Sequence, residues 1–230
     1  RRNATGSVYD YSLIEKQTLL DDAAIRRFIP EWPAISPSRP VIIGLDSGAD
    51  HPFGAVKIVA TEYGLVQVGE YLQRMKATSQ HLDPIGHVFG LSNVQSIRWA
   101  ANKNEANLRL EFGLKGVGVI PAESKHEIGI QRMQSWLYSG QFWFAYTCPK
   151  TIEQFRAYRY APNISTDGQK KTKEEVFKFQ DELPDADRYA VMAWPELPKA
   201  TESVMTESQR ARWASMDDRT KMEIERMREY

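Results

Sequence analysis

The chain has 230 residues, of which 42% are hydrophobic and 11% aromatic, so it is long enough to bury the core of one large domain. Thirty acidic and thirty basic side chains cancel to a formal net charge of zero, so a polyanionic partner would have to be held by a local basic patch or through metal ions. The single cysteine excludes an intramolecular disulfide and a cysteine-rich zinc site, and no apolar run reaches membrane-spanning length.

The first 39 residues are polar and end in a proline-rich stretch, which predicts a linker or an arm packed on the domain, with a short helix near residues 21–28. The core domain is expected over residues 40–195. It opens with three strand-like runs joined by short connections, which predict an antiparallel three-strand meander. These runs are 41–45, 53–60 and 65–71.

The rest of the core alternates between helical and strand-like patterns, so we expect an α/β fold with a central mixed sheet flanked by helices. Helices are predicted around 79–89, 104–113 and 125–139, from residue 149 onward, and at 185–194; strands are predicted at 94–99, 117–120 and 142–145. Beyond Pro198 charges alternate with few large apolar groups, so residues 196–230 are predicted to be a charged tail, either helical or flexible.

The first predicted strand ends in a carboxylate. Asp46 follows four apolar residues and a glycine and precedes Gly48 by two positions. At the end of a central strand such a side chain can enter a crevice, while the nearby glycine lets a bulky ligand approach the backbone. The alternative is an Asx-turn residue that only caps the strand, and for an isolated D-S-G this is the simpler interpretation.

Three more carboxylates lie within seven residues at the start of the last predicted helix: Asp181, Asp185 and Asp187. One of them can be explained as a helix cap. Because three such groups repel one another unless a cation or a proton intervenes, a hard divalent ion such as magnesium or manganese is a reasonable hypothesis. Two such ions could clamp the attacking and leaving oxygens of a phosphodiester displacement, which requires carboxylates from separate parts of the chain.

Taken together, these motifs resemble the nuclease domain of the large terminase subunit of tailed bacteriophages, which has an RNase H-like fold. The resemblance extends from about Val41 to Trp194. It rests on the strand ending in Gly44-Leu45-Asp46-Ser47-Gly48, on the segments 116–122 and 129–133, and on a closing motif. That closing motif comprises Lys178, Asp181, Glu182, Asp185, Ala186, Arg188 and Tyr189, and it is the most specific of these signals.

The resemblance implies that Asp46 bridges two Mg²⁺ or Mn²⁺ ions and that Asp185 ligates one of them. Glu182 takes a place often held by His or Asp in the family. Asp181 and Asp187 are further candidates, although either could instead cap the helix or orient a water on the ion.

One departure concerns the third acid that the family usually carries at the end of the strand around residue 98. The positions matched to it here are Ala100 and Ala101. Glu105, a turn later, or Asn102 could complete the ligand set, and Glu105 is therefore a candidate catalytic residue. The plain alternative, which we favour narrowly at this point, is that Glu105 is a helix-dipole partner at a helix N-terminus.

A basic strip is a candidate for holding DNA phosphates without reading bases, because the family places a hairpin before the last helix at the border of the DNA groove. Solvated surface is the alternative for any run of lysines. The residues concerned are Arg156, Arg159, Lys170, Lys171, Lys173 and Lys178.

The implied activity is a metal-dependent endonuclease that cuts concatemeric double-stranded DNA with little sequence preference during viral genome packaging. No phosphate-binding G-x-x-x-x-G-K-[ST] loop occurs in the chain, so the resemblance implies an ATPase domain before residue 1, joined through residues 1–39. The implied partners are DNA, the portal ring and the small terminase subunit, in the host-cell cytoplasm and without a membrane. The alternatives are another RNase H-like nuclease, such as a resolvase or transposase, and a nuclease-silent module that docks on DNA or on the portal.

Overall fold

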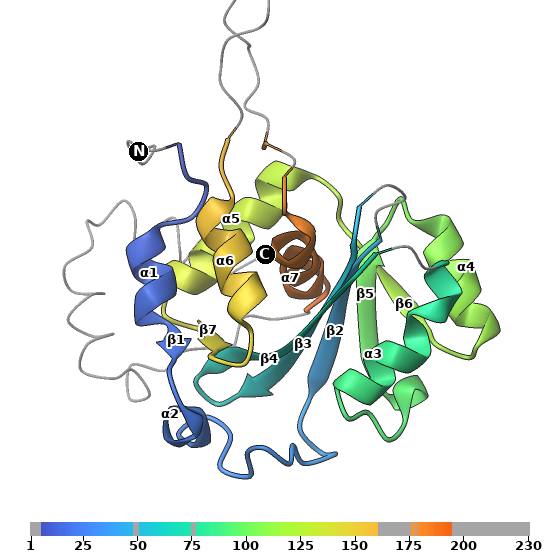
Figure 1. Ribbon diagram of the computed structural model, residues 1–230, viewed down its shortest axis with the longest axis horizontal. Helices are drawn as coiled ribbons and strands as arrows, with labels where there is room; N and C mark the ends of the chain where they lie inside the picture. The colour runs from blue at the N-terminus through green and yellow to red at the C-terminus, as the bar shows by residue number, and fades with distance from the viewer. Residues whose placement is uncertain (1–5, 48–50, 75–76, 161–175, 178, 195–230) are drawn as a thin grey trace, which may run out of the picture.

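The computed structural model describes residues 6–47, 51–74, 77–160, 176–177 and 179–194. These residues form a seven-stranded mixed sheet in the order β1-β7-β4-β3-β2-β5-β6 (Figure 1). The strands are β1 (Thr18–Leu19), β2 (Val41–Asp46), β3 (Phe53–Thr61), β4 (Gly64–Gln73), β5 (Arg98–Asn102), β6 (Val119–Ala122) and β7 (Phe142–Ala145). Strands β2, β3 and β4 are antiparallel neighbours, which confirms the predicted meander, and the remaining pairings are parallel.

Helices cover both faces of the sheet. Figure 1 shows α1, α5, α6 and α7 on one side and α3 and α4 on the other. The helices are α1 (Tyr11–Lys16), α2 (Asp22–Arg26), α3 (Leu82–Val88), α4 (Ala106–Leu114), α5 (His126–Tyr138), α6 (Pro149–Ala157) and α7 (Glu182–Ala193), with short 3-10 turns η1 (Thr78–Gln80) and η2 (Val94–Ser96). The described residues bury three apolar clusters, and α7 packs in the one on its own side of the sheet.

Strand β2 contributes side chains to both faces of the sheet. Ile42 belongs to the cluster on the α7 side, whereas Ile43 and Leu45 belong to the cluster under α3 and α4. Because successive side chains of a strand point to opposite faces, Gly44 and Asp46 project toward α7. The strand therefore delivers a carboxylate to the face that α7 covers.

Two strands begin later than predicted. The predicted strand at 94–99 is the turn η2 followed by β5, which starts at Arg98 and ends at Asn102, and the predicted strand at 117–120 is β6, which ends at Ala122. The side chain of Asn93 accepts the backbone N–H of Gln95 and starts the 3-10 turn. Local side-chain-to-backbone bonding of this kind competes with the sheet, which moves the strand toward the chain's C-terminus.

The N-terminal arm contributes to the sheet and to the core. Strand β1 pairs in parallel with β7, and Val8 and Ile14 are buried in the cluster on the α7 side. The predicted short helix near residues 21–28 is α2. Helix α1 and the two-residue strand β1 were not predicted, because both are too short to show a clear periodic pattern. The charged tail predicted for 196–230 lies outside the described residues.

None of the helices in the described part of the chain is both long enough and apolar enough to cross a lipid bilayer.

Candidate active site

Helix α7 lies against the backbone of β2 and β3. A Cβ atom added to Gly44 would lie 2.0 Å from the carbonyl oxygen of Ala186, and one added to Gly54 would lie 2.9 Å from that of Glu182. Any larger residue at Gly44 would force the helix away from the sheet. The two glycines therefore bring the first turns of α7 directly over the end of β2.

Asp46 is the last residue of β2 and pairs with Gly54 across the antiparallel ladder. Its side chain is half-buried on the face that α7 covers. The pKa of the Tyr189 hydroxyl is raised by burial, against the effect of Arg188, and further by the negative charges of Asp185 and Asp46. Asp46 from β2 and Asp185 from α7 thus both lie within electrostatic range of one hydroxyl group.

Asp185 is buried, and Tyr158 and Arg188 are among the groups that hold it. The hydroxyl of Tyr158 donates to its Oδ1 at 2.7 Å, and Arg188 contacts Oδ1 through Nε at 3.4 Å and Oδ2 through Nη2 at 3.2 Å. Burial alone would lower the pKa of Arg188, but the adjacent Asp185 carboxylate more than reverses this and raises it. Asp185 therefore has a fixed orientation and a balanced charge.

Glu105 lies within electrostatic range of Asp185. The hydroxyl of Ser47 donates a short hydrogen bond to Glu105 Oε2, which ties the residue after Asp46 to the start of α4. Burial raises the pKa of Glu105 to about 6 against the hydrogen bond from Ser47, and Asp185 adds to the increase. Although Glu105 occupies the N-cap position, its side chain makes no capping hydrogen bond, so the plain interpretation as a helix-end partner does not account for its orientation.

The position beside Asp46 on β5 belongs to Asn102. The parallel register pairs Leu45 with Ala101, which places Asn102 next to Asp46 at the end of the strand. Ala100 and Ala101, the positions matched to the third acid, are interior residues that are each fully buried in the core, whereas Asn102 stands at the end of the strand. The amide of Asn102 donates to the Tyr189 hydroxyl at 2.9 Å and accepts the backbone N–H of Asn104 at 2.9 Å.

The first residues of α7 are also buried. Asp181 occupies the N-cap position without a side-chain capping bond, and Glu182 Oε2 accepts from Nε2 of Gln154 at 3.0 Å. The backbone of Glu182 lies over Gly54, which pairs with Asp46. Glu182 is therefore placed near the end of β2, although its carboxylate is hydrogen-bonded to α6.

Asp187 lies on a different side of the helix. Two residues along an α-helix correspond to a rotation of about 200°, so Asp187 points away from the side that carries Asp185. Its pKa is raised well above the ordinary value by burial and by the charge of Glu70 on β4. It is therefore a poor candidate for an ion shared with Asp46.

The two predicted DNA-binding arginines within the described residues are engaged with aromatic rings. Arg156 lies over Tyr11 at 4.8 Å and is 3.9 Å from Glu15, and Arg159 lies over Phe177 at 5.1 Å. Both are exposed, and Arg159 directly follows Tyr158, the partner of Asp185. Lys170, Lys171, Lys173 and Lys178 lie outside the described residues.

The oxygen groups at this edge suit a hard divalent cation in kind, since they are carboxylates and an amide. Within the described ranges, no three His, Cys, Asp or Glu side chains are grouped closely enough to hold a metal ion by themselves. Mg²⁺ commonly keeps several waters and takes only one or two protein carboxylates, so a magnesium site does not require three of them. A half-buried carboxylate with a raised pKa, as at Glu105, is also the kind of group that a cation would stabilise.

The polar residues that hold these acids had no assigned role from the sequence. Ser47 and Tyr189 stood inside the recognised motifs, and their hydroxyls now contact Glu105 and Asn102. Tyr158 carried no signal, because only the fold brings the end of α6 to Asp185.

No family model and no curated protein matches the sequence. Solved structures do. A large terminase from a thermophilic bacteriophage matches 82% of this chain with a TM-score of 0.67 at 16% identity, and the match spans only 46% of that protein. The nuclease domain of the bacteriophage SPP1 large terminase with bound Mn matches this chain with a TM-score of 0.53 at 16% identity. The match covers 76% of this chain and 95% of the SPP1 domain. The large terminase nuclease of thermophilic phage G20c with bound magnesium matches this chain with a TM-score of 0.55 at 16% identity. The match covers 83% of this chain and 97% of the G20c nuclease.

At such identities the likeness establishes architecture. The meander, the parallel strands β5 and β6 and the covering helix α7 together give the chain the RNase H-like α/β fold of bacteriophage large terminase nuclease domains.

Proposed function

We propose that the protein is a metal-dependent endonuclease domain of a viral DNA-packaging terminase, which hydrolyses phosphodiester bonds of double-stranded DNA. The observation that supports this proposal is that Asp46 from β2 and Asp185 from α7 both lie within electrostatic range of the Tyr189 hydroxyl, while Glu105 lies within electrostatic range of Asp185. Nuclease domains of the same fold have been solved with Mn and with magnesium, which supports dependence on one of these ions.

In this proposal Asp46 and Glu105 are the direct ligands, with Asp185 as a further ligand or as the group that sets the local charge. Ser47 keeps Glu105 turned toward the end of β2, while Tyr158 and Arg188 hold Asp185 in place. A divalent ion bound here would supply the positive charge that offsets the negative charge developing on the phosphate oxygens. Two ions are expected, and their number is open to measurement.

The proposal extends to the longer protein. Because the chain spans less than half of the first of these large terminases, an ATPase domain in the same polypeptide is part of the proposal. So are contacts with the portal ring and the small terminase subunit in the host-cell cytoplasm. Exposed Arg159, which follows Tyr158 in the sequence, is a candidate in this proposal for holding a DNA phosphate.

The test is a plasmid-cleavage assay with Mn²⁺ or Mg²⁺, comparing the protein with Asp46→Asn. Asp46 is the cleanest choice because it is only half-buried, whereas a change at Asp185 would leave Arg188 buried without its partner. We expect the cleavage rate to fall about a hundredfold or more, as when a group that stabilises transition-state charge is removed. Calorimetric titration with Mn²⁺ should show weaker binding and gives the number of ions.

The matched control is Asp83→Asn, the same substitution at a carboxylate whose side chain is 85% exposed on α3. Its cleavage rate should equal that of the unchanged protein. Equal cleavage by Asp46→Asn would remove this site from the proposal.

A second candidate function is a nuclease-silent module that docks on DNA or on the portal. It is favoured by the neutral Asn102 beside Asp46 and by the pairing of Asp185 with Arg188. Retained DNA binding without cleavage under either ion would select this alternative.

A further inference from the structure

Arg109 brings a positive charge to the acidic edge from the first turns of α4. Its Nη1 donates to the backbone carbonyl of Asn102 at 3.0 Å, and the same carbonyl accepts the backbone N–H of Glu105 at 3.0 Å. Because helical side chains lean toward the helix N-terminus, the half-buried guanidinium extends back toward the end of β5. The register places Asn102 beside Asp46, so the guanidinium is fixed at this edge of the sheet.

The charge of Arg109 acts on one of the proposed ligands. Burial is the main influence on Glu105 and raises its pKa, whereas the hydrogen bonds from Ser47 and the positive charge of Arg109 oppose this rise. The negative charge of Asp185 raises the pKa further. Arg109 therefore lies within electrostatic range of Glu105, on the side of the site that α4 forms.

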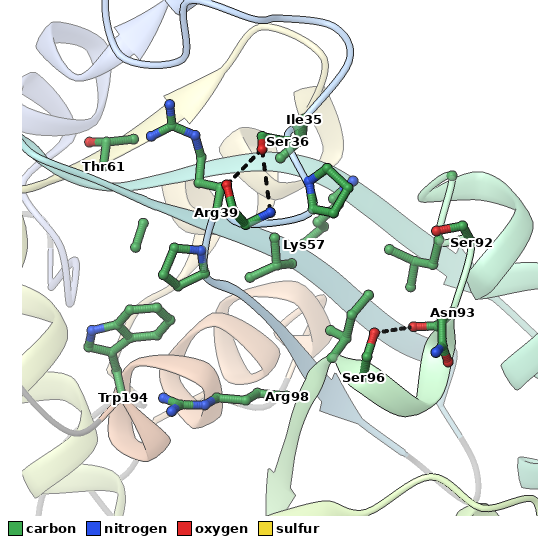
Figure 2. Close-up of a pocket in the computed structure, with 18 residues that line it drawn as sticks. Ile35, Ser36, Arg39, Lys57, Thr61, Ser92, Asn93, Ser96, Arg98 and Trp194 are labelled. Atoms are coloured by element: carbon green, nitrogen blue, oxygen red, sulfur yellow. Dashed lines mark hydrogen bonds between the residues drawn. The ribbon is translucent and has the colours of Figure 1, made fainter.

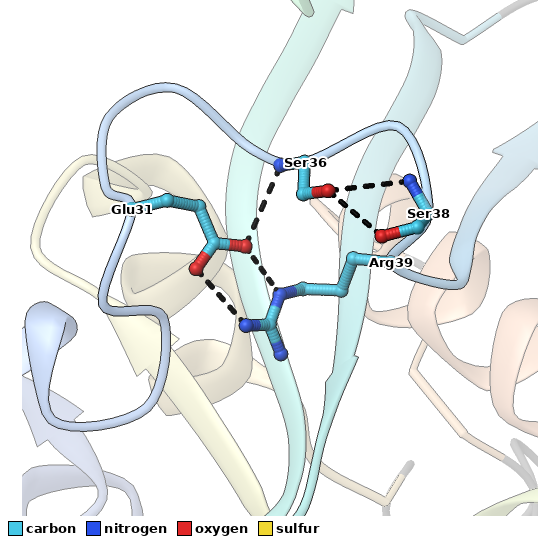
Figure 3. Close-up of polar contacts among 4 residues, drawn as sticks. All are labelled: Glu31, Ser36, Ser38 and Arg39. Atoms are coloured by element: carbon cyan, nitrogen blue, oxygen red, sulfur yellow. Dashed lines mark hydrogen bonds and ion pairs between the residues drawn. The ribbon is translucent and has the colours of Figure 1, made fainter.

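Arg39 shows how a charge-paired arginine is bound in this protein. Its Nε and Nη2 contact the two carboxylate oxygens of Glu31 at 2.6 and 3.0 Å, and Glu31 also accepts the backbone N–H of Ser36 at 3.4 Å (Figure 3). Arg109 makes no such ion pair with any residue that the structure describes. The Asn102 carbonyl takes one of the five N–H groups of its guanidinium, and no other acceptor among the described residues takes a second.

A second half-buried arginine is bound in the same manner far from the acidic edge. Arg132 Nη2 donates to the backbone carbonyl of Trp194 at 2.7 Å. Trp194 directly follows α7 and lines a cleft of about 700 Å³ at the opposite end of β2, together with Val41 and Arg98 (Figure 2). Since α7 has 12 residues, it separates Trp194 from the first residues of the helix by about 18 Å. Arg132 therefore matches Arg109 in burial and bonding but not in place.

We propose, building on the proposed function, that Arg109 holds a phosphate of the DNA backbone beside the acidic edge. A guanidinium presents parallel N–H groups that match two oxygens of a phosphate, and its single bond to Asn102 leaves this geometry available. The neighbouring carboxylates alone would repel a polyanion, so a cation fixed among them gives the backbone an attachment that no divalent ion has to supply. Such a contact positions the duplex without reading its sequence.

The test is a fluorescence-anisotropy titration of a short DNA duplex with the whole chain, in EDTA and at several salt concentrations. We expect Arg109→Gln to raise the dissociation constant about tenfold, as for loss of a hydrogen bond to a charged group. The slope of log affinity against log salt should fall by about 0.9, which corresponds to one phosphate contact. Arg109→Lys keeps the charge but not the planar fork, so it should keep the slope and bind about threefold more weakly. Arg132→Gln is the matched control and should bind as the unchanged protein does.

A role confined to structure gives a different result. If Arg109 only ties α4 to β5 and balances Glu105, Arg109→Gln should lower stability in urea and leave duplex affinity and salt slope unchanged. That outcome overturns the proposal, as does equal weakening by Arg132→Gln. Urea unfolding shows whether each variant is folded. Duplex affinity of Arg109→Lys equal to that of the unchanged protein would also overturn the proposal, even if Arg109→Gln does not fold.

The same measurements separate the role of Arg109 from the nuclease activity, because EDTA removes the divalent ions that cleavage requires. Weakened duplex binding by Arg109→Gln in a protein that cleaves no plasmid under either ion supports the role of Arg109 and removes the nuclease proposal. Normal duplex binding by Arg109→Gln, together with cleavage that depends on Asp46, removes the role of Arg109 alone.

Discussion

The two sides of α7 bury carboxylates in opposite ways. On one side Asp185 is held by Tyr158 and Arg188. On the other side Asp187 is fully buried, and neither of its oxygens has a hydrogen-bond partner within the described residues. The acid whose charge acts on it is Glu70, and the carboxylate of Glu70 accepts the N–H groups of Lys150 and Thr151 at the start of α6.

The two sides of α7 thus accommodate a buried carboxylate in two different ways. A buried carboxylate must be paired or must take up a proton, because the unpaired charge is costly in a low-dielectric interior. Asp185 is paired, and its side of the helix faces the end of β2. Asp187 has no ion pair within the described residues, so its burial favours the neutral, protonated acid. A neutral acid is better suited to packing in the core than to catalysis or metal binding.

The largest expected effect comes from removing the charge partner of Asp185. Arg188→Met keeps much of the side-chain length but leaves a buried carboxylate unpaired. We expect the free energy of unfolding in urea to fall by about 3–5 kcal/mol.

Adding Asp185→Asn to Arg188→Met should recover part of this loss, because the uncompensated charge is then gone. Arg27→Met, at an exposed arginine, is the control and should stay within about 0.5 kcal/mol of the unchanged protein. A loss below about 1 kcal/mol for Arg188→Met would mean that Asp185 does not depend on this partner.

A smaller effect is expected from the second partner. Tyr158→Phe keeps the buried ring and removes only the hydroxyl that donates to Asp185 at 2.7 Å. Unfolding free energy should fall by about 1.5–3 kcal/mol, the range for a hydrogen bond to a charged group. The matched control is Tyr146→Phe, whose hydroxyl donates to Asp22 at 3.1 Å on the surface and should matter less. Equal losses in the two variants would show that burial does not strengthen the Tyr158 bond.

The sequence was informative where periodic patterns and glycines set the backbone. The meander, the helices around residues 126–138 and 149–157 and the carboxylate at the end of β2 were all predicted. The arm was harder to predict, because β1 has only two residues and pairs with β7 more than 120 positions away. A strand pairing across that sequence distance leaves no local pattern in the sequence.

For the candidate site, the sequence indicated which acids to consider but not the environment of each. The spacing of Asp181, Asp185 and Asp187 indicated a single acidic group, yet helix geometry separates Asp185 from Asp187. The strand-end position was assigned to Ala100 or Ala101, whereas the register places Asn102 there, because β5 starts later than its apolar pattern indicated.

The smallest effect concerns Asp187 and depends on pH. Since the folded state raises its pKa above the unfolded value of about 3.9, the folded protein binds the extra proton and loses stability as pH rises from there toward the raised pKa. Asp187→Asn removes this titration. We therefore expect the variant to be more stable than the unchanged protein at pH 8, by about 1–3 kcal/mol, with a smaller difference at pH 5.

Unfolding in urea at several pH values between 5 and 8 measures this difference, with Asp83→Asn as the exposed counterpart. That control should shift stability by no more than about 0.5 kcal/mol at any pH. If Asp187→Asn lowered stability by the same amount at every pH, Asp187 would have to be charged and paired in the folded protein. The contrast between the two sides of α7 would then disappear, and Asp187 would again be a candidate for holding a cation.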